Sequence, residues 1–330
     1  MKKINLAIVG ATGMVGKTFL KVLEDRNFPV GELVLLASEK SVGKLIKFKG
    51  KDYEVEELTP ESMDPKRFQA ALFSVSAELS LIYGKIASER GIVVVDNSSA
   101  WRMAENIPLV VPEVNLEQAF GHGNLIANPN CSTIQSVIPL AVIDRLFKAK
   151  RVIYTTYQAV SGSGYEGVED LLRTQRGEEG IFYPKPIADN CLPHIDSFQE
   201  NGYTKEEQKM IDETRKILGK PDLAVTATCV RVPVKNGHSV AMNVTCELPI
   251  DLELLKKELK DSEGIVLYET GYPTAREADG QDKVLVGRLR VDGSEVNTLH
   301  LWSVADNIRK GAATNAVQIL EKLMEEISNH

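Results

Sequence analysis

Apolar and polar residues along the first hundred positions form blocks that predict alternating strands and helices. Short apolar runs of strand length occur at residues 4–9, 33–36, 70–75 and 92–95. Residues 77–90 have the composition of a helix, and a further helix, carrying Phe19, Leu20, Val22 and Leu23, follows the first run. Strands that alternate with helices in this way predict a doubly wound parallel sheet of the Rossmann type.

The next strand and helix are separated by a turn. The apolar residues 125–127 have the length of a buried strand, and residues 134–147 carry apolar side chains at helical spacing. Between these runs, residues 128–130 read Asn-Pro-Asn, which is typical of a turn. We therefore expect a helix to begin shortly after residue 130.

The second half of the chain is richer in strand-forming residues. Residues 151–160 predict a long strand, followed by a flexible Ser-Gly-Ser-Gly loop at 161–164. Two further strand-like runs occupy residues 224–234 and 239–248. If these runs pair as a hairpin, Asn-Gly supplies its turn. Residues 306–327 predict a helix that returns to the first domain.

Composition and charge narrow the class of protein. The 330 residues are 43% hydrophobic and 26% charged, which suits a globular chain with two cores. The net charge of −7, without long runs of either sign, argues against nucleic acid and anionic membranes as partners. No apolar run approaches the roughly 20 residues that span a bilayer. The run after Lys3 stops at Gly10, as expected of a first strand and not of a signal peptide.

The cysteines argue against a disulfide framework or a structural zinc site. They are widely spaced and form no Cys-x-x-Cys pair, at Cys131, Cys191, Cys229 and Cys246. This usage fits a reducing, cytoplasmic location, and we expect no bound metal.

Cys131 is the candidate nucleophile, because it lies at the start of a predicted helix, with Ser132 or Thr133 as the expected cap. Unpaired backbone N–H groups and the positive end of the helix dipole favour a thiolate there. The same N–H groups can hold an oxyanion on a carbonyl under attack. The alternative, from this stretch alone, is a small buried apolar residue.

The loop after the first strand predicts a phosphate-binding turn. It reads Gly10-Ala-Thr-Gly-Met-Val-Gly16 and leads into a helix, so that glycines let the backbone approach a pyrophosphate. The spacing departs from Gly-x-Gly-x-x-Gly, which leaves a plain strand-to-helix turn as one alternative. A second alternative is a relaxed Walker A motif over residues 11–18, which would indicate ATP or GTP hydrolysis.

The end of the second predicted strand is where a dinucleotide fold distinguishes its cofactor. Ser38, Lys40 and Ser41 favour the 2′-phosphate of NADP, whereas Glu39 is the contrary signal. A solvated loop is the alternative reading.

Three further side chains are candidates for binding or catalysis. Arg102 follows a predicted strand and can clamp a phosphate or carboxylate, or be a surface arginine. Arg231 and His238 flank the predicted hairpin turn, and a histidine in a polar turn is often a surface residue.

Taken together, these segments resemble the aspartate-semialdehyde dehydrogenase family along essentially the whole chain. Their order and spacing carry the resemblance, and they are residues 10–16, 95–102, 128–133, 157–164, 206–209, 229–234, 237–239 and 306–313. The resemblance implies the NADPH-dependent reductive dephosphorylation of L-aspartyl 4-phosphate to L-aspartate 4-semialdehyde, on the route to lysine, methionine and threonine. It also implies a homodimer or homotetramer.

The resemblance assigns roles residue by residue. Cys131 would form the acyl thioester, His238 would be the acid and base, and Gln158 would orient the acyl group. Arg231 would hold the substrate carboxylate and Glu206 its amino group. The leaving phosphate would lie among Arg102, Lys209 and Asn130. The cofactor would be lined by Gly10, Thr12, Gly13, Met14, Val15, Ser38, Lys40, Ser41, Ser161, Gly162 and Asn307. Relatives often carry Arg where this chain has Lys40.

The chemistry is coherent on its own terms. An acyl phosphate is already activated, so the reaction needs a thiolate, a phosphate clamp and a proton donor for the developing oxygens. A histidine near its ordinary pKa of about 6.5 can serve in both directions near neutral pH.

Two alternatives of other kinds remain besides the P-loop hydrolase. One is an N-acetyl-glutamyl phosphate type reductase, which lacks a free amino group for Glu206 to bind. The other is a regulatory module that binds a nucleotide without turnover.

We expect an α/β protein with two domains. Residues 1–128 with 307–330 are expected to form the NADP-binding domain. Residues 129–306 are expected to form an α+β catalytic and dimerisation domain with a mixed sheet.

Overall fold

The computed structural model describes residues 3–121 and 123–329. It divides into two compact units, one formed by Met1–Pro129 with Ala312–His330 and the other by Asn130–Gly311. No helix within the described residues has both the length and the apolar content to cross a membrane.

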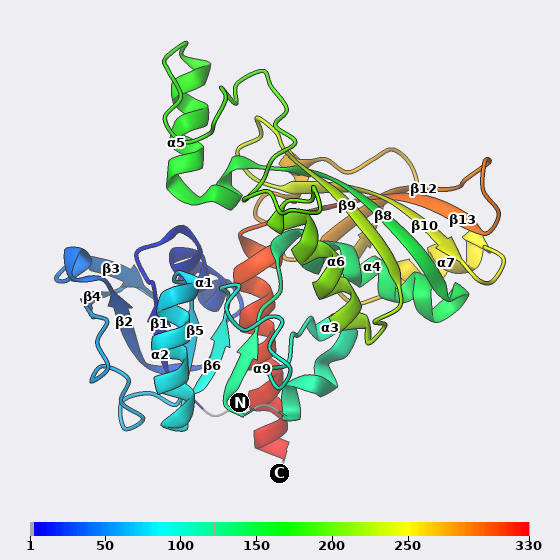
Figure 1. Ribbon diagram of the computed structural model, residues 1–330. Helices are drawn as coiled ribbons and strands as arrows, with labels where there is room; N and C mark the ends of the chain where they lie inside the picture. Colours follow the sequence, from blue (N-terminus) through cyan, green and yellow to red (C-terminus); the bar gives the residue numbers. More distant parts are fainter. Residues whose placement is uncertain (1–2, 122, 330) are drawn as a thin grey trace. The chain divides into compact units, whose positions relative to one another are not determined.

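The first unit contains the predicted Rossmann-type sheet, with strand order β3-β4-β2-β1-β5-β6-β7 (Figure 1). Neighbouring strands run parallel apart from the β3–β4 pair at one edge, which is antiparallel. The strands are β1 (Ile4–Val9), β2 (Val30–Ala37), β3 (Leu45–Phe48), β4 (Lys51–Glu57), β5 (Ala70–Phe73), β6 (Val93–Asp96) and β7 (Leu125–Ala127). The sequence analysis did not anticipate these two strands, because β3 has only four residues with one buried side chain, and most side chains of β4 are charged and at least partly exposed.

Helices of the first unit cover both faces of its sheet. They are α1 (Met14–Asp25), α2 (Ala77–Glu89), α3 (Pro112–Asn115) and α9 (Thr314–Asn329), with short 3₁₀ turns at Glu39–Ser41 and Leu116–Gly121. One apolar core joins the sheet to α1 and α9, and a second, on the opposite face, includes Ala87 of α2. The C-terminal helix, red in Figure 1, thus packs beside strands made by the N-terminal residues.

The second unit is built on a mixed sheet with strand order β11-β12-β13-β10-β8-β9. The β8–β9 and β11–β12 pairs are parallel, whereas β10 is antiparallel to both β8 and β13. The strands are β8 (Ala149–Gln158), β9 (Ala224–Arg231), β10 (His238–Cys246), β11 (Ile265–Leu267), β12 (Val284–Val291) and β13 (Thr298–Ala305). This is the mixed sheet expected for the middle of the chain.

Helices α4 (Cys131–Phe147), α6 (Lys205–Leu218) and α7 (Leu252–Asp261) pack on the sheet of the second unit. The unit also has α5 (Gly164–Gln175), α8 (Ala275–Ala278), a 3₁₀ turn at Val160–Ser163 and a π-helical turn at Arg309–Ala313 that ends across the boundary with the first unit. Twelve of the 17 residues of α4 are buried. Because α4 is enclosed, the position of its first residue is well determined by packing.

Two predictions about this unit are wrong. Residues 224–234 and 239–248 do not pair as a hairpin, because β8 lies between β9 and β10 in the sheet. The predicted flexible loop at 161–164 is instead a 3₁₀ turn running directly into α5. Arg231 and His238 nevertheless lie at one end of the sheet, because Arg231 is in register with Gln158 and Ser239 with Tyr157.

Candidate active site

Cys131 is the first residue of α4, and the residue before it supplies the cap. The Asn130 Oδ1 atom accepts hydrogen bonds from the backbone N–H groups of Ser132 at 2.9 Å and Thr133 at 3.3 Å. The prediction that Ser132 or Thr133 would be the cap is therefore wrong. Asparagine has the longer reach from the turn, and both hydroxyl-bearing residues lie inside the helix. The thiol is partly exposed at the N-terminal end of a buried helix.

Gly311, the last residue of the second unit, lies against Cys131. A Cβ atom placed on Gly311 would lie 2.9 Å from the Cβ of Cys131, which is closer than real side chains approach. Gly311 belongs to the π-helical turn Arg309–Ala313. The sequence analysis did not single out Gly311, and the small residues of Gly311-Ala312-Ala313 were the signal that was available.

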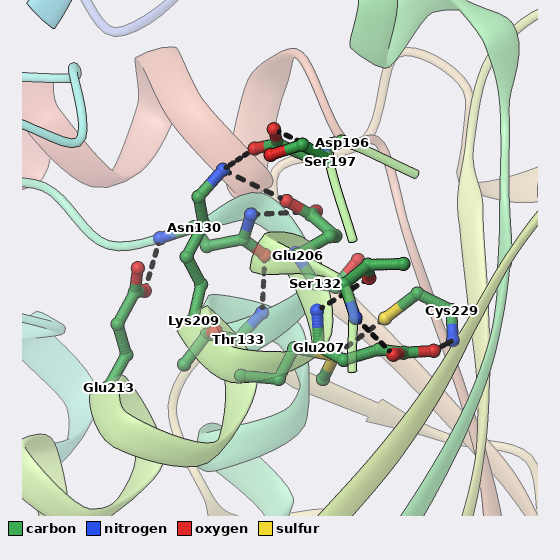
Figure 2. Close-up of polar contacts among 12 residues, drawn as sticks. Asn130, Ser132, Thr133, Asp196, Ser197, Glu206, Glu207, Lys209, Glu213 and Cys229 are labelled. Carbon is green, nitrogen blue, oxygen red and sulfur yellow. Dashed lines mark hydrogen bonds and ion pairs between the residues drawn. The ribbon is translucent and has the colours of Figure 1, made fainter. Parts of the chain in front are cut away.

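Several of the predicted site residues contact the buried carboxylate of Glu206 (Figure 2). Its Oε1 accepts hydrogen bonds from Asn130 Nδ2 at 2.8 Å and Gln158 Nε2 at 3.1 Å. Its Oε2 is 3.3 Å from Lys209 Nζ, which is also 2.9 Å from Asp196 Oδ2. The site thus joins α4, β8 and α6 through a single acidic side chain.

These donors keep Glu206 ionised in spite of its burial. Burial alone raises the pKa of this carboxyl, but the Lys209 ammonium, the bonds from Asn130 and Gln158, and the charge of Arg231 outweigh burial and lower it. A carboxylate has about four lone-pair positions, and the three donors that the structure shows use three of them. A ligand N–H can take the fourth.

Two neighbours of Glu206 have their own partners. Thr156 Oγ1 donates to Gln158 Oε1 at 2.9 Å, which fixes the orientation of the amide toward Glu206. Glu213 Oε2 accepts the backbone N–H of Asn130 at 2.6 Å. The sequence analysis missed Glu213, although Glu206, Lys209 and Glu213 are spaced i, i+3 and i+7 and therefore share one face of α6.

Arg231 is buried at the end of β9, with 4% of its surface exposed. Its Nη1 donates to the carbonyl oxygen of Ala159 at 2.7 Å. Among the described residues, no side chain or backbone group accepts a hydrogen bond from its Nε. A buried guanidinium with a donor still to be satisfied is suited to binding a carboxylate.

His238 is completely buried, contrary to the expectation for a histidine in a polar turn. Its Nδ1 accepts the backbone N–H of Ala159 at 2.9 Å. Burial, with a smaller effect of the Arg231 charge, holds the pKa of this imidazole well below its ordinary value. The prediction that His238 titrates near 6.5 is therefore wrong, because burial removes the charged ring from solvent and the Arg231 guanidinium opposes its charge.

Ser161, Gly162 and Asn307 line the same end of the sheet. Asn307 Nδ2 donates to Ser161 Oγ at 3.0 Å, and Asn307 Oδ1 accepts the backbone N–H of Gly237 at 2.9 Å. A Cβ on Gly162 would lie 3.0 Å from Arg231 Nη1 and 3.3 Å from His238 Nε2. The absence of a side chain at 162 therefore leaves room beside both groups.

In the first unit, the glycine-rich loop borders a pocket of about 470 Å³. A Cβ on Gly10 would lie 2.1 Å from the carbonyl oxygen of Ser74, and one on Gly16 would lie 2.1 Å from that of Gly10. The helix α1 begins after Gly13, which has no side chain to cap it, and its first turn has no acidic residue. These features fit the pyrophosphate of a dinucleotide.

The pocket also includes part of the segment that was expected to contact the ribose. Ser38 and Glu39 line it, together with Gly10, Thr12, Gly13, Ala37, Glu57, Leu58, Ser74, Val75, Leu79 and Tyr83. Ser41 is buried, with its hydroxyl 3.4 Å from that of Thr12 and 3.3 Å from Lys44 Nζ. Lys44 is a cation near this segment that the sequence analysis did not consider.

The geometry of the loop does not fit a Walker A motif. In a P-loop the lysine and the hydroxyl residue point at the phosphates and their metal. Here α1 begins at Met14, so Lys17 is the fourth residue of the helix, and its side chain is exposed. The hydroxyl of Thr18 donates to the carbonyl oxygen of Met14 at 2.9 Å.

Arg102 is buried in the first unit, so it is not a surface arginine. Its Nε donates to the carbonyl oxygen of Asn128 at 3.0 Å, and its Nη2 donates to that of Asn97 at 3.0 Å. These bonds connect the segment after β6 to the turn that precedes Cys131 in the chain.

Comparisons with known proteins agree over the whole chain. Family models match residues 5–122 as a semialdehyde dehydrogenase NAD binding domain and residues 140–310 as a semialdehyde dehydrogenase dimerisation domain. An aspartate-semialdehyde dehydrogenase of Aquifex aeolicus is 51% identical over 97% of this chain and 98% of its own.

Two solved structures extend the comparison. The Vibrio cholerae structure described as aspartate semialdehyde dehydrogenase II complexed with ASA is 47% identical, with a TM-score of 0.95 over 98% of this chain and 99% of the other. The Candida albicans aspartate semialdehyde dehydrogenase with NADP is 25% identical, with a TM-score of 0.77 over 98% and 99%.

Proposed function

Because the chain belongs to the aspartate-semialdehyde dehydrogenase family, we propose that it reduces L-aspartyl 4-phosphate to L-aspartate 4-semialdehyde, with release of phosphate. The reaction is reversible and belongs to the biosynthesis of lysine, methionine and threonine. We assign NADPH as its cofactor.

The ionised Glu206 is the observation that carries the choice of substrate. A buried carboxylate held charged by three donors, with Arg231 nearby, is complementary to a compound bearing both an ammonium and a carboxylate. An N-acetylated substrate has no ammonium, so its amide would offer Glu206 only a neutral donor in place of a charge-assisted one. This argues against the N-acetyl-glutamyl phosphate alternative.

Catalysis begins with the Cys131 thiolate, which attacks the acyl carbon. The C–O bond to phosphate breaks with its electron pair, phosphate leaves, and a thioester remains on the cysteine. NADPH, when bound, would supply the hydride that reduces the thioester. The C–S bond of Cys131 then breaks with its electron pair, which re-forms the thiolate and releases the aldehyde. Gln158 orients the acyl group, and Arg231 binds the α-carboxylate. Arg102, Lys209 and Asn130 are assigned to the leaving phosphate.

We assign the cofactor to residues 1–128 with 307–330, and catalysis and dimerisation to residues 129–306. The glycine-rich loop and α1 would hold the pyrophosphate. Ser161, Gly162 and Asn307 are also assigned to the cofactor. Ser38, Lys40 and Ser41 favour NADP over NAD, with Lys44 as an additional cation near Ser41. Glu39 lines the pocket and opposes this preference, so Glu39→Gln should raise the ratio of kcat/KM for NADP to that for NAD.

The second unit offers a surface for a homodimer. The side chains of Tyr157 and Trp302 meet on its sheet with ring centroids 5.5 Å apart, and Tyr157 is exposed. An exposed aromatic pair on a sheet is suited to burial against a second copy. We place the protein in the cytoplasm, where its thiols remain reduced.

The test is phosphate-dependent reduction of NADP by L-aspartate semialdehyde, in the reverse direction. Cys131→Ala should abolish it, whereas Cys191→Ala, at an exposed cysteine, should leave it unchanged. Inactivity of the wild type with NADPH still bound would favour the regulatory module instead. Persistence of activity in Cys131→Ala would refute the nucleophile.

A further inference from the structure

Lys209, which is assigned to the leaving phosphate, lies between two carboxylates (Figure 2). Its Nζ is 2.9 Å from Asp196 Oδ2 and 3.3 Å from Glu206 Oε2. The side chain of Glu206 is 7% exposed, whereas those of Lys209 and Asp196 are 27% and 36% exposed. One cation thus joins the buried acid assigned to the substrate ammonium to a second acid, nearer the surface, that has no role in the reaction described above.

Asp196 lies in a segment that is fixed to the sheet at one end and to α6 at the other. The backbone N–H of Leu192 donates to the carbonyl oxygen of Arg231 at 2.9 Å, and that of Arg231 donates back to Leu192 at 2.8 Å. Toward α6, the backbone N–H of Lys205 donates to the carbonyl oxygen of Ser197 at 2.9 Å. Asp196 is therefore held beside side chains assigned to the substrate.

The carboxylate of Asp196 has a defined position and charge. Its φ of +67° lies in the left-handed region, which aspartate adopts more readily than most residues. Oδ1 accepts the backbone N–H of Ser197 at 2.8 Å, and Oδ2 accepts a hydrogen bond from Lys209. Burial raises the pKa of this carboxyl, but these two bonds and the charges of Lys209 and Lys205 outweigh burial and lower it. Asp196 is therefore negatively charged at neutral pH.

A phosphate group that binds Lys209 must approach this negative charge. Together, one ammonium and two carboxylates have a net negative charge. In surroundings that resemble water, a phosphate dianion about 6 Å from a carboxylate is repelled enough to lose about tenfold in affinity, and salt reduces this loss. Asp196 thus opposes phosphate at the ammonium that is assigned to bind it.

Asp196 also helps to hold the ammonium in place, which acts in the opposite direction. However, Glu206 contacts the same ammonium from three residues earlier on α6, and its carboxylate is buried. An ion pair with a partly exposed partner contributes little to holding a side chain in place. When Asp196 loses its charge, the loss of repulsion should therefore outweigh the loss of positioning.

We propose that Asp196 competes with phosphate for the Lys209 ammonium and thereby weakens the phosphate subsite. It acts through Lys209 and is a positioning residue. In the reductive direction this competition favours release of phosphate, and in the reverse direction it raises the phosphate concentration that the enzyme needs. The proposal rests on the proposed function, which assigns Lys209 to phosphate.

Asp196→Asn tests the charge, because asparagine keeps the shape, tolerates the left-handed backbone and retains an oxygen for the N–H of Ser197. We expect KM for phosphate, measured during NADP reduction, to fall about three- to tenfold. KM for L-aspartate semialdehyde should change less than about twofold, since Glu206 still holds Lys209. The change in KM for phosphate should shrink as sodium chloride is added, because salt screens exposed charges.

Glu200→Gln is the matched control, because it removes an exposed carboxylate from the same segment and should leave both KM values unchanged. Titration of the free enzyme with inorganic phosphate, followed by calorimetry, gives a second measurement that needs no turnover. Asp196→Asn should bind phosphate more tightly than the wild type by about the same factor as the fall in KM.

Unchanged or weaker phosphate binding in Asp196→Asn, or an equal fall in both KM values, would overturn the proposal. Tighter phosphate binding by a variant of an enzyme that does not reduce NADP with the semialdehyde would support the role of Asp196 and refute the proposed function. Phosphate-dependent activity with the same KM for phosphate in both proteins would have the opposite meaning.

Discussion

Glu206 and His238 are two buried titratable side chains at the same end of one sheet, and their surroundings impose opposite charge states. Glu206 is met by an ammonium and two amide donors, which outweigh burial and lower its pKa. His238 is buried, accepts a bond from a backbone donor and lies in the field of the Arg231 guanidinium. These surroundings oppose its cationic form and lower its pKa well below 6.5.

The difference shows that the partner, more than burial, decides whether a group is charged. Donors around an acid keep it anionic, and donors around a base keep it neutral. In this site the result is a fixed negative charge suited to an ammonium, beside a neutral imidazole. Each prediction below removes one side of this contrast.

The largest effect is expected from Glu206→Gln, which keeps the shape and removes the charge. Loss of one partner of a buried ion pair costs about 2–5 kcal/mol, so kcat/KM for L-aspartate semialdehyde should fall about 100-fold or more. Steady-state kinetics provide the measurement. The neighbouring Glu207→Gln is the matched control, because Glu207 serves the capping box of α6 and the backbone of Cys229. It should lower stability without this loss, and equal losses in both variants would contradict the role of Glu206.

A tenfold effect that depends on pH is expected from Asn130→Asp. The aspartate keeps the oxygen that caps α4 but replaces the donor to Glu206 with a second negative charge. The pKa of Glu206 should rise, so the acidic limb of the pH–activity profile should move to higher pH. An unchanged acidic limb would show that the bond from Asn130 does not control the charge of Glu206.

Gly162→Ala should raise about tenfold both the KM for the substrate, which Arg231 is assigned to bind, and the KM for NADP, which Gly162 is assigned to line. The added methyl would lie 3.0 Å from Arg231 Nη1 and 3.3 Å from His238 Nε2, so it would crowd both groups. Steady-state titration of both substrates tests this. Gly293→Ala, where a Cβ would contact nothing within 4 Å, is the control. Wild-type kinetics in Gly162→Ala would exclude a ligand from this space.

The smallest effect concerns stability. His238 is neutral in the folded protein and titrates near 6.5 when unfolded, so its folded pKa is the lower one. The unfolded chain therefore binds the extra proton first, and stability is lost as pH falls below about 6.5, by up to about 1.4 kcal/mol per pH unit. Urea unfolding of wild type and His238→Gln from pH 7.5 to 5.5 measures this. The difference in stability between them should change with pH, and a constant difference would contradict a neutral buried histidine.

Local sequence patterns predicted most elements of the first unit, because the residues that form its nucleotide-binding turn are close together in the sequence. A strand, a glycine-rich turn and a helix occur within residues 4–25, and the parallel sheet follows from their alternation. The strands β3 and β4 were missed because β3 has only four residues and β4 is largely charged. In this unit, the spacing of apolar residues and glycines is therefore enough to predict most of the strands and helices.

The site of the second unit depends on which strands become neighbours. Arg231 and His238 were expected together through a hairpin, yet they lie together because β8 is inserted between their strands. The burial of His238 and the bond from Ala159 arise from that insertion, so the pattern of a polar turn was misleading. Gly311 lies against Cys131 from 180 positions away, and no local pattern encodes such an approach.

The most direct test of the central claim is to mix the enzyme with L-aspartate semialdehyde and NADP in the absence of phosphate and to follow NADPH formation at stopped-flow times. The account predicts a burst stoichiometric with active sites, followed by slow turnover, with an acyl group on the Cys131 peptide by mass spectrometry and full turnover once phosphate is added. The absence of a burst in an enzyme that turns over with phosphate, or an acyl group on another residue, would contradict it.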